Sequence, residues 1–383
     1  MSDELLMIPG PTNLARRVAE AMSRPQLGHL DPRFLESFKE TLNLTRYLFV
    51  NYTGMPFVLS GSGTIGMEAA IVSLIEPGDK VLCLDTGYFG KRFIDLATIH
   101  GAKVDALHFE TGKHANPNVV DEKLSKDGYK AITITHVETS NGLSNPIKDL
   151  VKIARKYDVY SIIDSVASVG GCELVFDQLG ADIVITCSQK VIAAPPGATL
   201  LAVSKRALDT FENRKTPIQS YYMNLARWRK FMEEPGIYLA TPSIQILLAL
   251  REALLMIKEE GLENRWRRHK IIADAIRAGL EALNLSIVAE EGYRSNTVTG
   301  FFTPEGKAFD IHSMLRESYK IHLAHGLGDL KGKILRIGHF GNITQKETVA
   351  LLSALEMSLR AVNIDVKKGS AVKAAIPYLE ELV

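Results

Sequence analysis

The sequence contains little cysteine, almost no charge imbalance and no long apolar run. Its 383 residues include three cysteines, Cys83, Cys172 and Cys187, an odd number at no metal-ligand spacing. Such a set is neither the disulfide framework of a small secreted protein nor the ligand set of a structural zinc site. We therefore expect reduced, buried thiols, no bound metal and a cytoplasmic protein.

Acidic and basic side chains nearly cancel. The 45 lysines and arginines oppose 44 aspartates and glutamates, which leaves a net charge of +1. This balance gives no electrostatic reason to expect nucleic acid or an anionic membrane as a partner. The longest apolar helix, expected over residues 244–257, is too short to span a bilayer and carries Arg251 and Glu252 in its middle. The acidic start at residues 1–4 does not fit a signal peptide.

Hydrophobic residues, by contrast, are plentiful. They make up 46% of the chain, and the length favours one large and one small domain. Up to about residue 203, short apolar strands alternate with amphipathic helices, which predicts an α/β fold with a mostly parallel sheet covered on both faces. We expect an N-terminal arm over residues 1–15, a large domain over 16–259 and a smaller C-terminal α+β domain over 260–383. Residues 287–288 are expected to form a strand, and residues 214–242 a long irregular connection that is functional or bridges subunits.

Two strand ends carry an acid and a lysine. The apolar strand over residues 159–164 ends at Asp164, and the strand over residues 183–187 runs into a polar turn that stops at Lys190. Ligands of parallel sheets bind at the carboxyl ends of the strands. A carboxylate that pairs with a pyridine nitrogen and a lysine that forms an imine are the apparatus of a pyridoxal phosphate (PLP) enzyme. Taken singly, Asp164 also reads as a capping acid and Lys190 as a solvated loop lysine, although the apolar residues 191–194 favour a semi-buried amine with a lowered pKa.

Residues 61–66 spell G-x-G-x-x-G between a strand and a helix. Asp85 ends the next strand, so the stretch matches a dinucleotide fingerprint and would make the protein an NAD-dependent oxidoreductase. It also matches a phosphate cup, in which backbone N–H groups and the hydroxyls of Ser62 and Thr64 hold one phosphate. A purely structural tight turn is the third interpretation. The spacing alone does not separate the three.

Three further side chains suit the PLP interpretation. Phe89 lies between two glycines past a strand end and either stacks on a flat ring or fills the core. Thr139 or Ser140, after the strand over residues 131–135, is placed to hydrogen-bond the phenolic oxygen of the cofactor. Arg336 lies inside an apolar strand, and a buried arginine needs a partner, either a substrate α-carboxylate or a structural ion pair.

A series of short motifs along nearly the whole chain resembles one family, the class V aminotransferases of the alanine–glyoxylate and serine–pyruvate group. In order, the motifs are Gly10-Pro11-Thr12, Ser60-Gly61-Ser62-Gly63-Thr64, His136-Val137-Glu138-Thr139-Ser140, Val166-Ala167-Ser168, Ser188-Gln189-Lys190, Ala194-Pro195-Pro196-Gly197 and Leu335-Arg336-Ile337-Gly338. The ordered set favours PLP for residues 61–66.

This resemblance implies a fold type I PLP-dependent transferase that is a homodimer with shared active sites. It implies that Lys190 is the Schiff-base lysine, with Asp164 at the ring nitrogen, Val166 on one ring face and Phe89 on the stacking side. It also implies that the cofactor phosphate is contacted by Ser62, Gly63, Thr64 and Gln189, and across the subunit interface by Tyr238 and Thr241. The phenolic oxygen of the cofactor would be contacted by Thr139. The substrate would be contacted by Arg336 and Gly10. The family often has tryptophan where Phe89 stands and histidine where Thr64 stands, so these two positions depart from its pattern.

The expected function is transamination between a small amino acid, alanine or serine, and a small 2-oxo acid, glyoxylate or pyruvate, by a ping-pong mechanism. Another fold type I enzyme, a lyase or an aminophosphonate aminotransferase, is the alternative, and the NAD oxidoreductase remains a more distant one. A desulfurase would need a mobile catalytic cysteine, which none of the three cysteines resembles.

Overall fold

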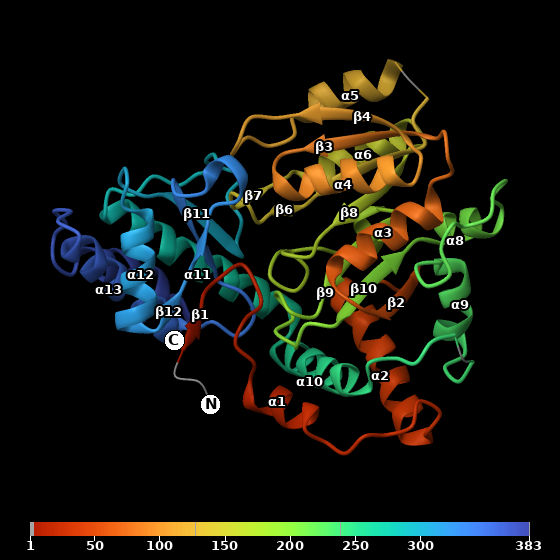
Figure 1. Cartoon of the computed structure of the whole chain (residues 1–383), viewed down its shortest axis with the longest axis horizontal. Helices are drawn as coiled ribbons and strands as arrows, with labels where there is room; N and C mark the ends of the chain where they lie inside the picture. Colours follow the sequence, from red (N-terminus) through yellow and green to blue (C-terminus); the bar gives the residue numbers. More distant parts are fainter. Residues whose placement is uncertain (1–3, 127, 238, 383) are drawn as a thin grey trace.

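A seven-stranded sheet forms the centre of the larger part of the molecule (Figure 1). The structure is a computed structural model that describes residues 4–126, 128–237 and 239–382. In spatial order the strands are β2 (Met55–Ser60), β10 (Ala198–Val203), β9 (Ile183–Cys187), β8 (Tyr160–Asp164), β5 (Ala131–Thr135), β3 (Lys80–Asp85) and β4 (Lys103–His108). β10 runs antiparallel to both of its neighbours, whereas the other pairs are parallel. The other six strands therefore end at the same edge, as predicted for a mostly parallel sheet.

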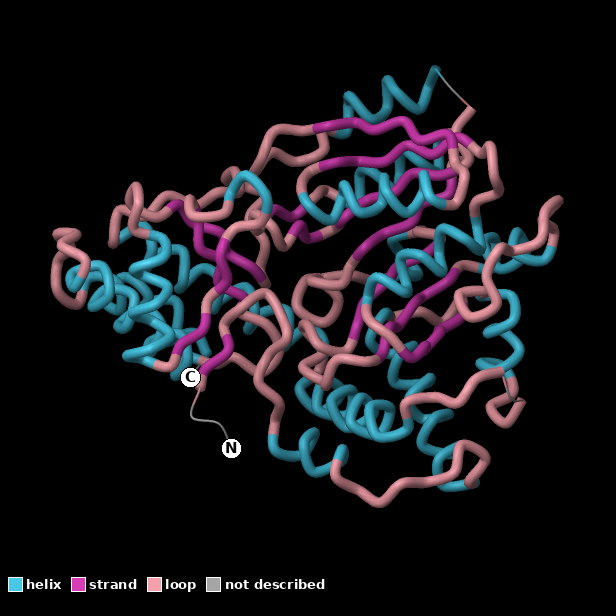
Figure 2. Tube along the Cα trace, viewed as in Figure 1, coloured by secondary structure: helices cyan, strands magenta, loops and turns pink. Residues whose placement is uncertain are grey.

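Helices cover this sheet on both faces, as the alternating pattern predicted (Figure 2). α3 (Gly63–Leu74) and α4 (Tyr88–Ile99) contact each other and lie on one face, and α6 (Ile147–Lys156) and α10 (Ile244–Glu260) lie on the other. The central strands β5, β9 and β10 are buried at every position, because a layer of helices excludes water from each face. The remaining described helices of this part are α1 (Arg16–Met22), α2 (Pro32–Phe49), α5 (Pro117–Lys126), α7 (Phe176–Leu179), α8 (Lys205–Glu212) and α9 (Leu225–Glu233).

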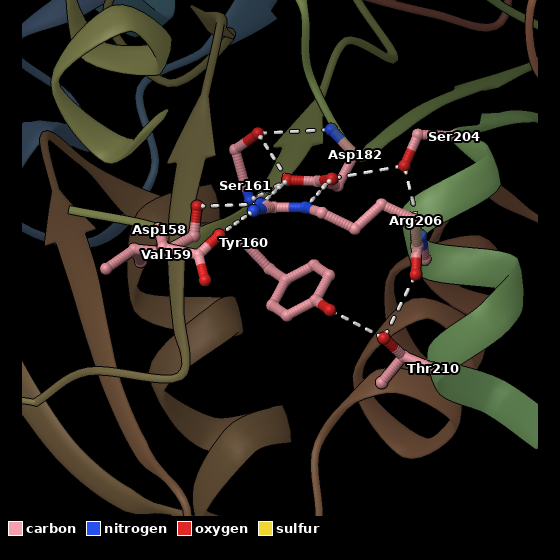
Figure 3. A network of polar contacts seen from close by, with 9 residues as sticks. Asp158, Val159, Tyr160, Ser161, Asp182, Ser204, Arg206 and Thr210 are labelled. Atoms are coloured by element: carbon pink, nitrogen blue, oxygen red, sulfur yellow. Dashed lines mark hydrogen bonds and ion pairs between the residues drawn. The ribbon is translucent and has the colours of Figure 1, made fainter. Parts of the chain in front are cut away.

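The edge of the sheet opposite the strand ends is held by a buried ionic network (Figure 3). Asp182, which precedes β9, has no solvent exposure and accepts hydrogen bonds from Arg206 Nε at 3.0 Å and Arg206 Nη2 at 2.9 Å. It also accepts from the backbone N–H of Ser161 at 2.9 Å and from Ser204 Oγ at 3.1 Å. A buried carboxylate needs such partners, so this network fixes the starts of β8, β9 and α8 relative to one another.

The C-terminal region, from α11 (Leu262–Ala282) onward, has its own hydrophobic cluster and a small antiparallel sheet. The sheet runs in the order β11 (Val298–Phe302), β14 (Ile334–Gly338) and β13 (Ala324–His325). Its helices are α12 (Ala308–Tyr319), α13 (Gln345–Ala361) and α14 (Ser370–Leu379), with short 3₁₀ turns at Gly328–Leu330 and Glu380–Leu382. The mixture of helix and antiparallel strand agrees with an α+β region, while the exact domain boundaries stay a prediction.

The N-terminal arm joins the two parts. Its strand β1 (Leu5–Leu6) pairs in parallel with β12 (Ile321–His322) of the C-terminal region, and Met7 belongs to that region's hydrophobic cluster. The arm then reaches the strand ends of the large sheet, where a carbonyl of the arm, that of Pro9, accepts a hydrogen bond from Lys190.

Two local predictions were wrong. Residues 214–242 are not irregular throughout, because they contain α9 (Leu225–Glu233), whose Trp228 is 2% exposed and whose start is capped by the Asn224 side chain. Residues 287–288 form a single bridge, Ile287 to Phe301, rather than a strand. A short hairpin of β6 (Val137–Glu138) and β7 (Leu143–Ser144) follows β5. A bilayer-spanning helix is absent from the described part of the chain.

Candidate active site

The carboxyl-end edge of the sheet carries a cavity of about 350 Å³. The turns after β2, β3, β8 and β9 line it together with the N-terminal arm. The predicted site residues among its walls are Gly10, Ser62, Gly63, Thr64, Phe89, Asp164, Val166, Gln189 and Lys190. Residues up to 180 positions apart are thus gathered in one place (190 − 10).

Lys190 presents its amine inside this cavity. Its Nζ donates to the carbonyl oxygen of Pro9 and lies 5.7 Å from the ring centroid of Phe340. Burial lowers the pKa of Lys190, and the charges of Arg336 and Arg92 push it in the same direction against the opposing effect of Asp164. A neutral amine is the form that attacks a carbonyl carbon, so the surroundings favour a nucleophilic lysine.

Gly10 is the residue of the arm that passes over Lys190. Its φ is +84°, and a Cβ there would lie 2.4 Å from Lys190 Cδ. A side chain at this position would therefore collide with the lysine stem in addition to straining the backbone. Glycine is required for the arm and the lysine to share this space.

Asp164 ends β8 with its side chain 4% exposed. Burial raises the pKa of Asp164 to about 6, while the N–H of Val166, which donates to Oδ1 at 2.9 Å, and the charges of Lys190 and Arg92 oppose this shift. Within the described residues, Oδ2 accepts no hydrogen bond. A buried carboxyl group with one open oxygen facing a cavity is suited to a cationic ring nitrogen, which would favour its ionised form.

Ser62, Gly63 and Thr64 lie at the N-terminus of α3. Ser62 occupies the cap position, yet its hydroxyl makes no capping hydrogen bond to the helix. A Cβ on Gly63 would lie 2.7 Å from Val166 Cγ2, so the turn approaches the strand-end residues too closely for a larger side chain. The positive end of the helix dipole and the unused hydroxyl of Ser62 form a site for an anion such as a phosphate.

Arg336 and Thr139 contact each other beside the cavity and are not among its lining residues. Arg336, 7% exposed in β14, donates from Nη1 to the Thr139 carbonyl at 2.8 Å and from Nε to the His325 carbonyl at 2.8 Å. Burial lowers the pKa of Arg336 to about 10. In the part of the chain that the structure describes, Nη2 has no acceptor, and a carboxylate is the ligand that such an open guanidinium edge binds best.

The comparisons with known proteins agree on one family. The family described as aminotransferase class V matches residues 18–352. An uncharacterized aminotransferase of Methanocaldococcus jannaschii is 38% identical over 99% of this chain and 98% of its own length. The alanine–glyoxylate aminotransferase of Callithrix jacchus is 36% identical over 91% of this chain and 86% of its own. The crystal structure of the ureidoglycine–glyoxylate aminotransferase of Bacillus subtilis matches with a TM-score of 0.96 at 32% identity, over 99% of both chains.

The chain belongs to the class V aminotransferases. It is a PLP-dependent transaminase of fold type I, as the resemblance of its motifs implied. The interpretation of residues 61–66 as a dinucleotide fingerprint, and with it the NAD oxidoreductase, is wrong. The cavity of this aminotransferase fits the cofactor, since it combines a buried amine, a buried carboxyl group with an open oxygen and an anion-binding turn.

The three cysteines of this aminotransferase are buried and unpaired, as predicted. Burial raises the pKa of Cys187, which lines the cavity, to about 12. A thiol of that pKa is almost entirely protonated at neutral pH and is a poor nucleophile. This argues against a desulfurase that would use the cysteine in the cavity.

Two functional candidates were missed from the sequence. Glu138, with no solvent exposure, accepts hydrogen bonds from the N–H groups of Phe89 (3.0 Å), Gly90 (3.3 Å) and Ser140 (3.1 Å), and from Ser140 Oγ (2.6 Å). It holds the first turn of α4, which carries Phe89, against the hairpin that follows β5. Arg92, one helical turn after Phe89, lines the cavity itself. That spacing was the available signal, because residues three apart on a helix lie side by side.

The structure does not test two further predicted residues. Thr241 is exposed and is not a lining residue, and Tyr238 lies outside the described residues. Their expected contact is with the cofactor phosphate of a partner subunit, so their roles stay a prediction.

Proposed function

We propose that this aminotransferase moves an amino group from alanine or serine to glyoxylate or pyruvate. The observation that carries the proposal is the open edge of Arg336, a single buried guanidinium beside the cavity that suits one α-carboxylate. The name of the Callithrix jacchus relative, alanine–glyoxylate aminotransferase, supports this substrate pair. So does the serine–glyoxylate aminotransferase of Arabidopsis thaliana, which is 32% identical over 98% of this chain and 95% of its own length.

The side chains would divide the work as follows. Arg336 holds the substrate carboxylate, and Asp164 pairs with the ring nitrogen of the cofactor. Lys190 Nζ would take the proton from the Cα of the amino donor in the first half of the cycle and would give a proton to the Cα of the product amino acid in the second half. The bound cofactor supplies an aldehyde that carries the amino group and a ring that accepts electrons. Because the first product leaves before the second substrate binds, ping-pong kinetics follow.

Two further assignments belong to this proposal. A homodimer would bring Tyr238 and Thr241 of one subunit to the phosphate of the other. A cytoplasmic location suits the three free, buried thiols, which are typical of a reducing compartment.

A panel of amino donors tests the substrate class. The holoenzyme is mixed with alanine, serine, aspartate, glutamate or an aminophosphonate, with glyoxylate and then pyruvate as the acceptor, and kcat/KM is measured for each pair. We expect alanine or serine to be the best donor. A preference for dicarboxylic donors or aminophosphonates would show that the proposed substrate class is wrong.

A further inference from the structure

Arg92 connects two walls of the active-site cavity. Its Nη1 donates to Thr64 Oγ1 at 3.0 Å, and its guanidinium carbon lies 4.6 Å from the centroid of the Phe89 ring. Thr64 belongs to the anion-binding turn at the start of α3, and Phe89 belongs to the side expected to stack on the cofactor ring. The guanidinium is therefore located where the phosphate and the ring of the cofactor would meet.

The charge of Arg92 is not neutralised by a protein carboxylate. Within the described residues, it forms no ion pair, and its contacts are a hydroxyl and aromatic rings. A guanidinium has five N–H donors, so a single bond to Thr64 leaves most of them for another acceptor. The positive charge also acts within the cavity, because it opposes the raised pKa of Asp164 and contributes to the lowered pKa of Lys190.

The cavity needs such a charge for its cofactor. Among the described lining residues, Lys190 and Arg92 are the two with cationic side chains. Lys190 would form the covalent bond with the aldehyde of the cofactor, so its charge would not be available to the phosphate. The N-terminus of α3 contributes the equivalent of only about half a positive charge, whereas a phosphate monoester carries nearly two negative charges at neutral pH.

We propose that Arg92 is a cofactor-binding residue that holds the phosphate of PLP together with the turn of residues 62–64, and that Thr64 positions it for this contact. This inference rests on the placement of the cofactor phosphate at that turn, which belongs to the proposed function. The preference of the site for a phosphorylated cofactor over an unphosphorylated one would then depend on Arg92, which none of the sequence motifs contains.

The test compares PLP with pyridoxal, which lacks the phosphate. Both ligands are titrated into the apo-protein, and their dissociation constants are measured from the quenching of protein fluorescence. In Arg92→Gln we expect PLP binding to weaken by about tenfold or more, as for the loss of a charged hydrogen bond, with a much smaller change for pyridoxal. Arg92→Lys keeps the charge without the planar fork and should lie between Arg92→Gln and the wild type.

Lys91→Gln provides the matched control. Lys91 is the exposed neighbour of Arg92 on α4, so this variant removes the same formal charge from the same helical turn without touching the cavity. Its ratio of pyridoxal to PLP dissociation constants should equal that of the wild type. Circular dichroism of each apo-protein shows whether it is folded. If Arg92→Gln does not fold, Arg92→Lys carries the test.

Three outcomes would overturn the proposal. If Arg92→Gln weakens both ligands by the same factor, the guanidinium acts only by supporting Phe89 and does not hold the phosphate. If Ser62→Ala lowers the selectivity for PLP and the Arg92 variants do not, the phosphate placement stands and Arg92 has no part in it. If the wild-type protein binds both ligands equally, the proposed placement of the phosphate fails as well.

Discussion

The buried carboxyl group of Asp164 should weaken the apo-protein at neutral pH. Burial raises the pKa of Asp164 from 3.8 to about 6, so the folded protein binds this proton more tightly than the unfolded chain does. The contribution of Asp164 to the free energy of unfolding is therefore largest at acidic pH and decreases as the pH rises from below 3.8 to above 6. The loss is complete above the folded pKa, because both states are then ionised.

The size of the effect follows from the shift. About two pKa units correspond to about 3 kcal/mol at pH 8, and roughly half of this loss has already occurred at pH 5. Asp164→Asn removes the ionisation but keeps an oxygen that accepts from the Val166 N–H. We therefore expect the apo-variant to be more stable than the apo wild type by up to about 3 kcal/mol at pH 8 and by clearly less at pH 5.

Urea unfolding of both apo-proteins at pH 5 and pH 8 measures this difference. Asp95→Asn, on the exposed face of α4, is the control and should show no comparable gain. The same Asp164→Asn variant should bind PLP more weakly, because its amide cannot pair with a cationic ring nitrogen. A variant that is less stable than the wild type at pH 8, or a gain that does not grow with pH, would refute the reasoning.

Three further substitutions address other parts of the molecule. Asp182→Ala leaves Arg206 without its buried partner and should lower the free energy of unfolding by about 3–5 kcal/mol in urea titrations, with little effect on kcat once the protein is folded. Gly10→Ala places a methyl group against the stem of Lys190 and should reduce kcat on the order of a hundredfold, and the strain at φ +84° should also lower the unfolding midpoint. Arg336→Lys keeps a positive charge but replaces the planar guanidinium and its open Nη2 by a single ammonium group, so steady-state kinetics should show a KM for the amino donor raised by roughly tenfold or more and a smaller change in kcat.

Two of these predictions have a comparison within the chain. Asp158 also pairs with Arg206, but its side chain is 93% exposed, so Asp158→Asn should lower stability by less than about 1 kcal/mol. Gly78 also has a positive φ and has open space where a Cβ would lie, so Gly78→Ala tests backbone strain without a collision. If Gly78→Ala and Gly10→Ala reduced kcat equally, the contact with Lys190 would not explain the effect.

Much of the site was predictable because its residues follow strands. Apolar strands are recognisable from short runs of buried residue types, and the carboxyl ends of parallel strands meet at one edge. This is why the sequence predicts that Asp164 and Lys190 lie together. The same reasoning gives Ser62 and Phe89, which follow β2 and β3.

The remaining features depend on contacts that a linear pattern does not contain. The partners of Glu138 at Phe89 and Gly90 lie 49 and 48 residues upstream, and Thr64 lies 28 residues before Arg92. α9 was missed for a different reason, because only nine residues form it and charged residues separate its apolar residues along the sequence. Short helices of this kind are stabilised by packing, here of Trp228 and Phe231 into the core, rather than by their own propensity.

The N-terminal arm couples the reactive lysine to the C-terminal region over a very short length of chain. Leu6 is paired with His322 of that region, and Pro9, three residues later (9 − 6), accepts the hydrogen bond of Lys190 Nζ. Three extended residues span at most about 10 Å, so this connection is too short to allow a large displacement between its two ends. A rotation of the C-terminal region relative to the central sheet would therefore pull the Pro9 carbonyl away from the amine. Domain movement and the protonation state of Lys190 would then be mechanically linked through a segment that contributes no side chain to the chemistry.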